Sequence, residues 1–137
     1  PHLQGDAVAI ITNAGGAGIM AADAVEQRGL RIAGLKSQTI DFMRQYLPPS
    51  ANIYNPIDLL GDASATTYEK VLDAVLKDET VHAVITIVTP QVTAQVEETA
   101  RAMRELLDQD VVAAVGVSNF TPDQMQRFRE ECPIHVC

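Results

Sequence analysis

The sequence predicts an α/β fold, namely a three-layer, flavodoxin-like domain with a five-stranded parallel sheet in the order 2-1-3-4-5. Two observations predict it. Short apolar or β-branched segments alternate with amphipathic helical segments along the whole chain, which is typical of strands joined by crossover helices. Residues 7–11 are apolar without a break, as in a strand covered on both faces. Five such units are too few for a barrel of eight.

The chain opens with a predicted strand, a glycine-rich turn and a helix. Gly15, Gly16 and Gly18 follow the strand, and an alanine-rich stretch follows them. Closely spaced glycines let the backbone approach a ligand, and a helix N-terminus carries unpaired N–H groups and about half a positive charge. The turn therefore predicts an anion site, most often one for phosphate. The alternative is that these glycines serve only a tight turn.

No motif identifies the phosphate ligand. Residues 16–21 fit the loose dinucleotide pattern G-x-G-x-x-A, but the second strand ends in Leu35, Lys36 and Ser37 and the next carboxylate is Asp41. A dinucleotide site calls for an acidic residue at that strand end. The Walker A pattern is missing as well, since no Gly-Lys-Ser/Thr follows the turn. We therefore expect a phosphate or a phosphorylated group.

The other elements follow in order. Residues 31–35 form the second strand and 39–47 a helix, with Ser37 as its cap and prolines at its end. Residues 48–65 form one long irregular stretch, of a length that is often functional. The remaining predicted elements are a helix over 66–77, strands over 81–89, 111–117 and 134–137, and helices over 93–107 and 122–131, with Thr121 as the cap of the last.

The predicted strand order brings several of these segments together. Ligands of such sheets bind at the carboxyl ends of the first and third strands. We expect residues 13–18, 55–62, 89–91 and 118–119 to meet there. The candidate phosphate-binding residues are Asn13, Gly15, Gly16, Ala17, Gly18 and Ile19, and the candidate rim residues are Asn55, Asp58, Asp62, Thr89 and Gln91.

Each candidate side chain also has a plainer role. Asn13 either holds the loop through an Asx-type hydrogen bond or touches the ligand, and we favour the loop-holding role. In one interpretation, Asp58 and Asp62 act as a general base or as magnesium ligands. In the plainer one, Asp58 ties down the loop while Asp62 or Ser64 caps the next helix. Thr89 and Gln91 offer hydrogen bonds at the rim, or merely end a strand.

The sequence predicts no catalytic residue and no metal site in this chain. The three histidines, His2, His82 and His135, all lie away from the predicted crevice loops. Cys132 and Cys137 have neither metal-ligand nor redox spacing, so we expect two reduced thiols.

Composition bounds the function further. The net charge is −8, from 10 basic and 18 acidic residues, which argues against a nucleic-acid face or an anionic membrane surface. No signal peptide or membrane span is recognisable, so we expect a cytoplasmic protein. Residues 1–137 form one expected domain with residues 1–5 as a linker tail, and both ends look cut from a longer multidomain chain.

Three motifs in order carry a family resemblance. They are TNAGGAGIMAADA, LPPSANIYNPIDLLGDAS and TPQ, and the resemblance runs from about Asp6 to Pro90, with strands and helices continuing in step to the end of the chain. In this combination the chain resembles the NDP-forming acyl-CoA synthetases, which include the ADP-forming acetate–CoA ligases and are related to succinyl-CoA synthetase. Within that family it is similar to the second flavodoxin-like ligase domain.

The resemblance implies a role for the glycine turn. In such enzymes an acyl phosphate forms, a histidine takes up the phosphoryl group and CoA captures the acyl group. The helix that begins near Gly16 would stabilise that phosphoryl group through its backbone. ATP or ADP, Mg and CoA would serve the whole enzyme, with none bound by this domain. Its partners would be a CoA-binding domain, a phosphohistidine-bearing ligase domain and an ATP-grasp module, and a homo-oligomer is also conceivable.

The chain departs from the family at three places. None of its histidines lies in a small-residue carrier loop, so the isolated domain is expected to be inactive. Ala17 stands where the family often has proline, and Ser118-Asn119-Phe120 replaces a glycine-bearing turn. The carboxylic acid and the choice of ADP or GDP are not encoded here.

Two other functions remain open at this point. One is a flavodoxin-like module for FMN or a nucleotide, although 4% aromatic residues and no tryptophan leave few rings to hold a flavin. The other is a regulatory domain of the ligase-like protein lysine acetyltransferases.

Overall fold

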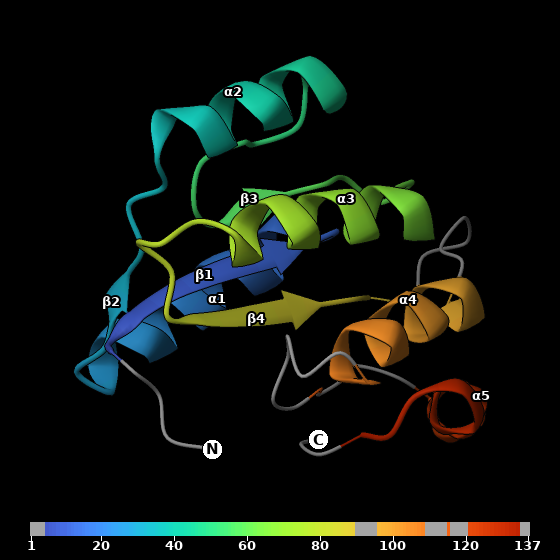
Figure 1. Ribbon diagram of the computed structural model, residues 1–137. Helices are drawn as coiled ribbons and strands as arrows, with labels where there is room; N and C mark the ends of the chain where they lie inside the picture. Colours follow the sequence, from blue (N-terminus) through green and yellow to red (C-terminus); the bar gives the residue numbers. More distant parts are fainter. Residues whose placement is uncertain (1–4, 90–95, 109–114, 116–120, 135–137) are drawn as a thin grey trace.

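The computed structural model describes residues 5–89, 96–108, 115 and 121–134 (Figure 1). Strands and helices alternate as predicted, and α5 has the predicted bounds. The elements are β1 (Ala7–Thr12), α1 (Gly15–Gln27), β2 (Arg31–Ile32), α2 (Ser37–Tyr46), β3 (Ile57–Asp58), α3 (Ala65–Leu76), β4 (Ala83–Ile87), α4 (Val96–Asp108) and α5 (Pro122–Glu131).

β1 is the centre of a four-stranded parallel sheet. β4 pairs with β1 from Val8 to Thr12, whereas β2 pairs only with its start and β3 only with its end. A strand has two edges, so β2 and β3 must share the edge that β4 leaves open. The predicted first strand, β1, thus lies between the predicted second strand, β2, and the predicted third strand, which is β4, as expected. The predicted strands over 111–117 and 134–137 lie largely outside the described residues, and β3 was not predicted.

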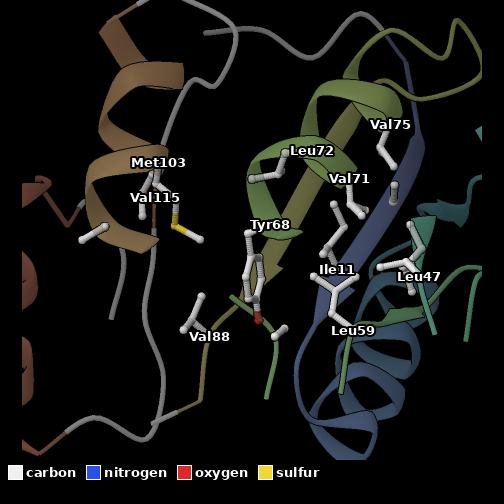
Figure 2. Close-up of a cluster of buried hydrophobic side chains, with 14 of the residues drawn as sticks. Ile11, Leu47, Leu59, Tyr68, Val71, Leu72, Val75, Val88, Met103 and Val115 are labelled. Carbon is white, nitrogen blue, oxygen red and sulfur yellow. The ribbon is translucent and has the colours of Figure 1, made fainter. Parts of the chain in front are cut away.

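Helices cover both faces of the sheet. Side chains of a strand alternate between its faces, and Val8 and Ile10 pack with Val25 of α1 in one cluster. Ile11 belongs to the larger cluster on the other face, where Figure 2 shows Tyr68 of α3 beside it. This second cluster continues through α4 and α5, so the predicted three-layer arrangement is confirmed in the part of the chain that the structure describes.

The start of α2 differs from the prediction. Ser37 is the first helical residue and not the cap, and Lys36 at the N-cap position makes no side-chain cap bond. Instead the carboxylate of Asp78, from the turn before β4, accepts hydrogen bonds from the Lys36 amide (2.8 Å) and the Thr39 hydroxyl (2.7 Å). It also accepts bonds from the amide (3.0 Å) and the hydroxyl (2.6 Å) of Thr80. The Asp78 carboxylate thus fastens the start of α2 to the turn before β4.

These hydrogen bonds set the acidity of Asp78. Burial acts to raise its pKa, but the bonds from Thr80, Thr39 and the Lys36 amide outweigh burial and hold the pKa at about 2. The residue is only 3% exposed, so Asp78 is a buried carboxylate that stays ionised.

The other two predicted caps are confirmed. The Ser64 side chain accepts a hydrogen bond from the Thr67 amide at the start of α3. Thr121 and Gln124 form a complete capping box at the start of α5, with Pro122 in the first turn. Within the described residues, no helix has both the length and the apolar character that a membrane span requires.

Candidate phosphate site at the start of α1

The turn between β1 and α1 is held by Thr12. Its hydroxyl accepts from the Ala14 amide (3.0 Å) and donates to the Ala14 carbonyl (3.1 Å). Ala14 is the N-cap, has an extended backbone and offers no side-chain cap. The first helical hydrogen bond runs from the Gly18 amide to the Ala14 carbonyl (3.2 Å).

Three amides therefore precede the helical ladder, those of Gly15, Gly16 and Ala17. No group in the described part of the chain accepts a hydrogen bond from them. Gly16 is exposed and its two neighbours are half-buried, so the turn is open to solvent. Unpaired donors at the positive end of a helix are what an anion needs.

The three glycines of the turn have different roles. A Cβ on Gly16 would meet no atom within 4 Å, so packing does not require glycine there. A Cβ on Gly18 would lie 3.0 Å from Thr12 Cγ2 and 3.3 Å from Pro56 Cβ, so Gly18 allows α1 to pack closely against the loop. The amide of Gly18 is already in the helical ladder, and Ile19 lies one residue further along. The predicted phosphate contacts therefore fit Gly15, Gly16 and Ala17 better than Gly18 and Ile19.

Asn13 holds the loop, although through a distant partner. Its side chain is 3% exposed and donates to the Thr89 carbonyl (3.0 Å), while its Oδ1 accepts from the Thr89 amide (2.8 Å) and hydroxyl (3.0 Å). Asn13 and Thr89 meet at the carboxyl ends of β1 and β4, as the predicted topology requires. Each engages the other, so the Asn13 side chain fastens the two strand ends together.

Asn55 lies at the edge of β1, between β2 and β3. Its Oδ1 accepts from the Ile10 amide (2.9 Å), and its Nδ2 donates to the carbonyls of Val8 (2.8 Å) and Ala33 (3.0 Å). The side chain supplies the hydrogen bonds that a continuous neighbouring strand would otherwise make. The expected rim residue is thus part of the sheet in this structure.

Asp58 lies at the start of α1. Its Oδ1 accepts from the Leu60 amide (3.0 Å), and its Oδ2 would lie 2.8 Å from a Cβ on Gly15. Only glycine leaves room for the carboxylate at position 15, and Asp58 ties down its own loop as the plainer interpretation has it. Asp62 is exposed, and no hydrogen bond of its side chain is seen among the described residues.

Tyr68 is a buried neighbour of this region. Burial, together with the charge of Asp58, raises the pKa of its hydroxyl, which donates to the Ile87 carbonyl (3.1 Å). Tyr68 therefore remains neutral and serves as a donor in the core.

The other reactive side chains have structural surroundings. His82 Nδ1 accepts from the Ala7 amide (3.1 Å), and burial raises the pKa of the Cys132 thiol to about 11. No group of three or more potential metal ligands occurs among the described residues. Several sequence-predicted residues lie outside that part, namely His2, Gln91, Ser118, Asn119, His135 and Cys137.

Sequence reasoning missed Thr12 and Asp78. Asp78 carried a local signal, because the spacing Asp78-x-Thr80 is typical of a turn in which the carboxylate binds the backbone two residues on. Thr12 carried none, since a threonine at the end of a β-branched run is unremarkable by itself.

Comparison with known proteins identifies the family. Residues 8–130 match the family model described as the Ligase-CoA domain. The chain is 32% identical to acetate–CoA ligase [ADP-forming] II subunit alpha of Pyrococcus furiosus over 139 aligned positions. This alignment covers 96% of this chain and 30% of that protein. It is 47% identical over 90 residues to acetate–CoA ligase [ADP-forming] I of Archaeoglobus fulgidus, covering 66% of this chain and 13% of that protein.

A solved structure agrees with the fold. PH0766 from Pyrococcus horikoshii OT3 superposes with a TM-score of 0.83 at 28% identity, over 99% of this chain and 33% of that one. A shorter alignment, with the aldo-keto reductase YhdN of Bacillus subtilis, shows 46% identity over 47 residues. It covers 34% of this chain and 14% of that protein. That match covers too little of the chain to define its family.

The chain thus spans less than a third of the two acetate–CoA ligases that it matches. Both the family model and the Pyrococcus furiosus subunit extend over nearly all of its residues. The chain belongs to the Ligase-CoA domain family, which the ADP-forming acid–CoA ligases share.

Proposed function

We propose that this domain works within an ADP-forming acid–CoA ligase, where the start of α1 stabilises a phosphoryl group that another domain delivers. One observation carries the proposal, namely three amides without acceptors in the described residues, at an exposed turn beside the carboxyl end of β1. The names of the acetate–CoA ligase relatives support the reaction, which would convert an acid, CoA and ATP into acyl-CoA, ADP and phosphate.

The proposal assigns the nucleophile to another domain. His82 is occupied by the Ala7 amide, and Cys132 is buried with a raised pKa. Ile19 and Met20 are 59% and 74% exposed next to the open turn, which supports a covering domain in the parent enzyme. A CoA-binding domain, a phosphohistidine-bearing domain and an ATP-grasp module would supply the remaining chemistry with CoA, ATP or ADP, and Mg. The isolated chain would then form no acetyl-CoA.

Finer features of the domain are part of this proposal. We propose two further strands, over 111–117 and 134–137, which the packing of Val115 and Ile134 with the larger core cluster supports. Residues 1–5 would be a linker, and the parent enzyme would be cytoplasmic. The faces that meet other domains would also allow association of isolated copies. The FMN and acetyltransferase alternatives are not favoured by the relatives.

Replacing Gly16 tests the backbone contact. Gly16→Pro removes one amide while keeping a φ that suits a first helical turn, and Gly15 before it has no Cβ to clash with the ring. Gly16→Ala keeps the amide, and its Cβ has open space. In the complete multidomain enzyme we expect Gly16→Pro to lower the rate of acetyl-CoA formation by about tenfold or more relative to Gly16→Ala.

The control is the melting temperature of both variants, which should agree within a few degrees. Equal rates from two folded variants would show that the Gly16 amide does not contact the transferred group.

A further inference from the structure

A histidine fastens the start of β1 to the start of β4, at the opposite end of β1 from the phosphate turn. β4 begins beside the first residues of β1, with Val8 paired to Ala83 (Figure 1). Just before this pair, the Ala7 amide donates to His82 Nδ1 (3.1 Å), and the His82 amide donates to the Ala7 carbonyl (2.9 Å). Both backbone groups of Ala7 therefore bind one residue, which lies 75 positions further along the chain.

Gly5 leaves room for the imidazole of His82. A Cβ on Gly5 would lie 2.2 Å from His82 Nδ1 and 2.4 Å from His82 Cε1. Contacts this short do not occur at a real Cβ, so any other residue at position 5 would push the ring away. The glycine is therefore part of the contact, because it allows the ring to stay beside the Ala7 amide.

The contact requires a neutral imidazole. Nδ1 accepts a hydrogen bond, so the single proton of the neutral ring is on Nε2. A protonated imidazole carries an N–H at both nitrogens and would turn a donor toward the Ala7 amide. Ala7 is fully buried, and among the described residues its amide has no acceptor other than His82. His82 itself is exposed, so a proton from solvent can reach the ring.

The charged residues next to this contact are engaged elsewhere. Asp6 pairs with Arg31 of β2 (2.9 Å), and Glu79 pairs with Lys36. Asp78 is held by the four hydrogen bonds described above, and β4 contains no titratable side chain. Within the described part of the chain, the groups that decide the protonation of His82 are therefore the Ala7 amide and the solvent, rather than an ion pair.

We propose that His82 is a pH-sensitive switch, which holds residues 5–7 against the start of β4 while its ring is neutral. Histidine is the side chain that gains a proton in mildly acidic solution. Once the ring is protonated, two donors face each other, the ring leaves the Ala7 amide, and the segment that enters β1 separates from β4.

The inference goes beyond the proposed function and does not depend on it. The phosphate turn follows the other end of β1, and no phosphoryl group is involved in the switch. In the proposed enzyme residues 1–5 would be a linker, so the switch would govern how firmly that linker is held to this domain.

The test is amide hydrogen exchange of the ¹⁵N-labelled 137-residue chain, expressed as protection factors so that the intrinsic pH dependence of exchange cancels. Between about pH 7.5 and about pH 5, we expect the protection of the Ala7 amide to fall by about tenfold or more. The Ile10 amide is the internal control. It lies on the same strand and also donates to a side chain, Asn55 Oδ1 (2.9 Å), which gains no proton in this range, so its protection should not change.

His82→Asn separates the hydrogen bond from the proton. The Oδ1 of asparagine lies close to the position of the histidine Nδ1 and accepts a bond at either pH, so the Ala7 amide should stay protected at about pH 5. His82→Ala has no acceptor and should give low protection at both pH values. Gly5→Ala should lower the protection already at about pH 7.5, because its Cβ displaces the ring.

The ¹⁵N shifts of the imidazole give a second readout, since they identify the nitrogen that carries the proton. We expect the proton on Nε2 while the ring is neutral. The proposal is overturned if the neutral ring carries its proton on Nδ1, or if the Ala7 amide of the wild type is equally protected at both pH values. It is also overturned if His82→Asn loses protection on acidification as the wild type does.

Discussion

Asn55→Ala is expected to lower the free energy of unfolding by about 3–5 kcal/mol. The substitution leaves the Ile10 amide and the Ala33 carbonyl without their partner, whereas the Val8 carbonyl loses one bond and keeps the one from the Ala33 amide (2.8 Å). All three residues are at most 2% exposed, so water cannot readily replace the lost bonds. Each buried backbone group left unpaired costs about 1–3 kcal/mol. Urea unfolding followed by circular dichroism measures the difference.

Asn52→Ala is the matched control. The Asn52 side chain also makes three backbone hydrogen bonds, to the Tyr54 amide and the Tyr54 and Pro56 carbonyls, but it is exposed. Water can take over these bonds, and we expect a loss below about 1 kcal/mol. If both variants lost the same stability, Asn55 would not be a substitute for strand pairing.

Asp78→Ala is expected to destabilise the fold by about 3–4 kcal/mol. Four donors lose their acceptor, namely the amides of Lys36 and Thr80 and the hydroxyls of Thr39 and Thr80. Bonds to an ionised acceptor are worth more than neutral ones. The start of α2 would also lose the group that fastens it to the turn before β4. Asp73→Asn, at an exposed pair with Lys77, is the control and should cost less than about 0.5 kcal/mol.

The same carboxylate should make stability depend on pH. The folded pKa of Asp78 is about 2, below its ordinary value of 3.8, so the unfolded chain binds the proton more readily. The contribution of Asp78 is therefore fully present above about pH 4 and is lost as the pH falls toward 2. Wild type and Asp78→Asn, unfolded in urea at a series of pH values, should differ most at neutral pH and converge in that interval. A difference that stays constant down to pH 2 would contradict the assigned hydrogen bonds.

Most of the fold could be predicted because its signals are local. The apolar run of β1, the 3.6-residue periodicity of α3 and the Thr121–Pro122 start of α5 each depend on neighbouring residues only. β3 was missed because Ile57 and Asp58 are too short a strand to show a period, and they pair only once the chain has returned to β1. The second strand was predicted too long for a related reason: its apolar pattern continues beyond Ile32, but the Asn55 side chain occupies the β1 edge there.

The candidate site divides in the same way. The glycine turn and its open amides follow from the sequence between Asn13 and Gly18, because a helix start leaves its first N–H groups unpaired wherever it occurs. The role of each polar side chain does not follow. Asn55 and Asp58 were both candidates for a ligand rim, but the Asn55 side chain bonds to the sheet, whereas Asp58 lies beside Gly15 and ties down its own loop, the plainer of its two predicted roles.

The sequence by itself determined the α/β alternation, the position of the glycine turn and the family to which its motifs point. Only the tertiary structure decided what Asn13, Asn55 and Asp78 bind. Their partners Thr89, Ile10 and Thr39 are 76, 45 and 39 residues away along the chain. Hydrogen bonds of this kind form only after the crossovers have set the strands side by side, so no local pattern encodes them.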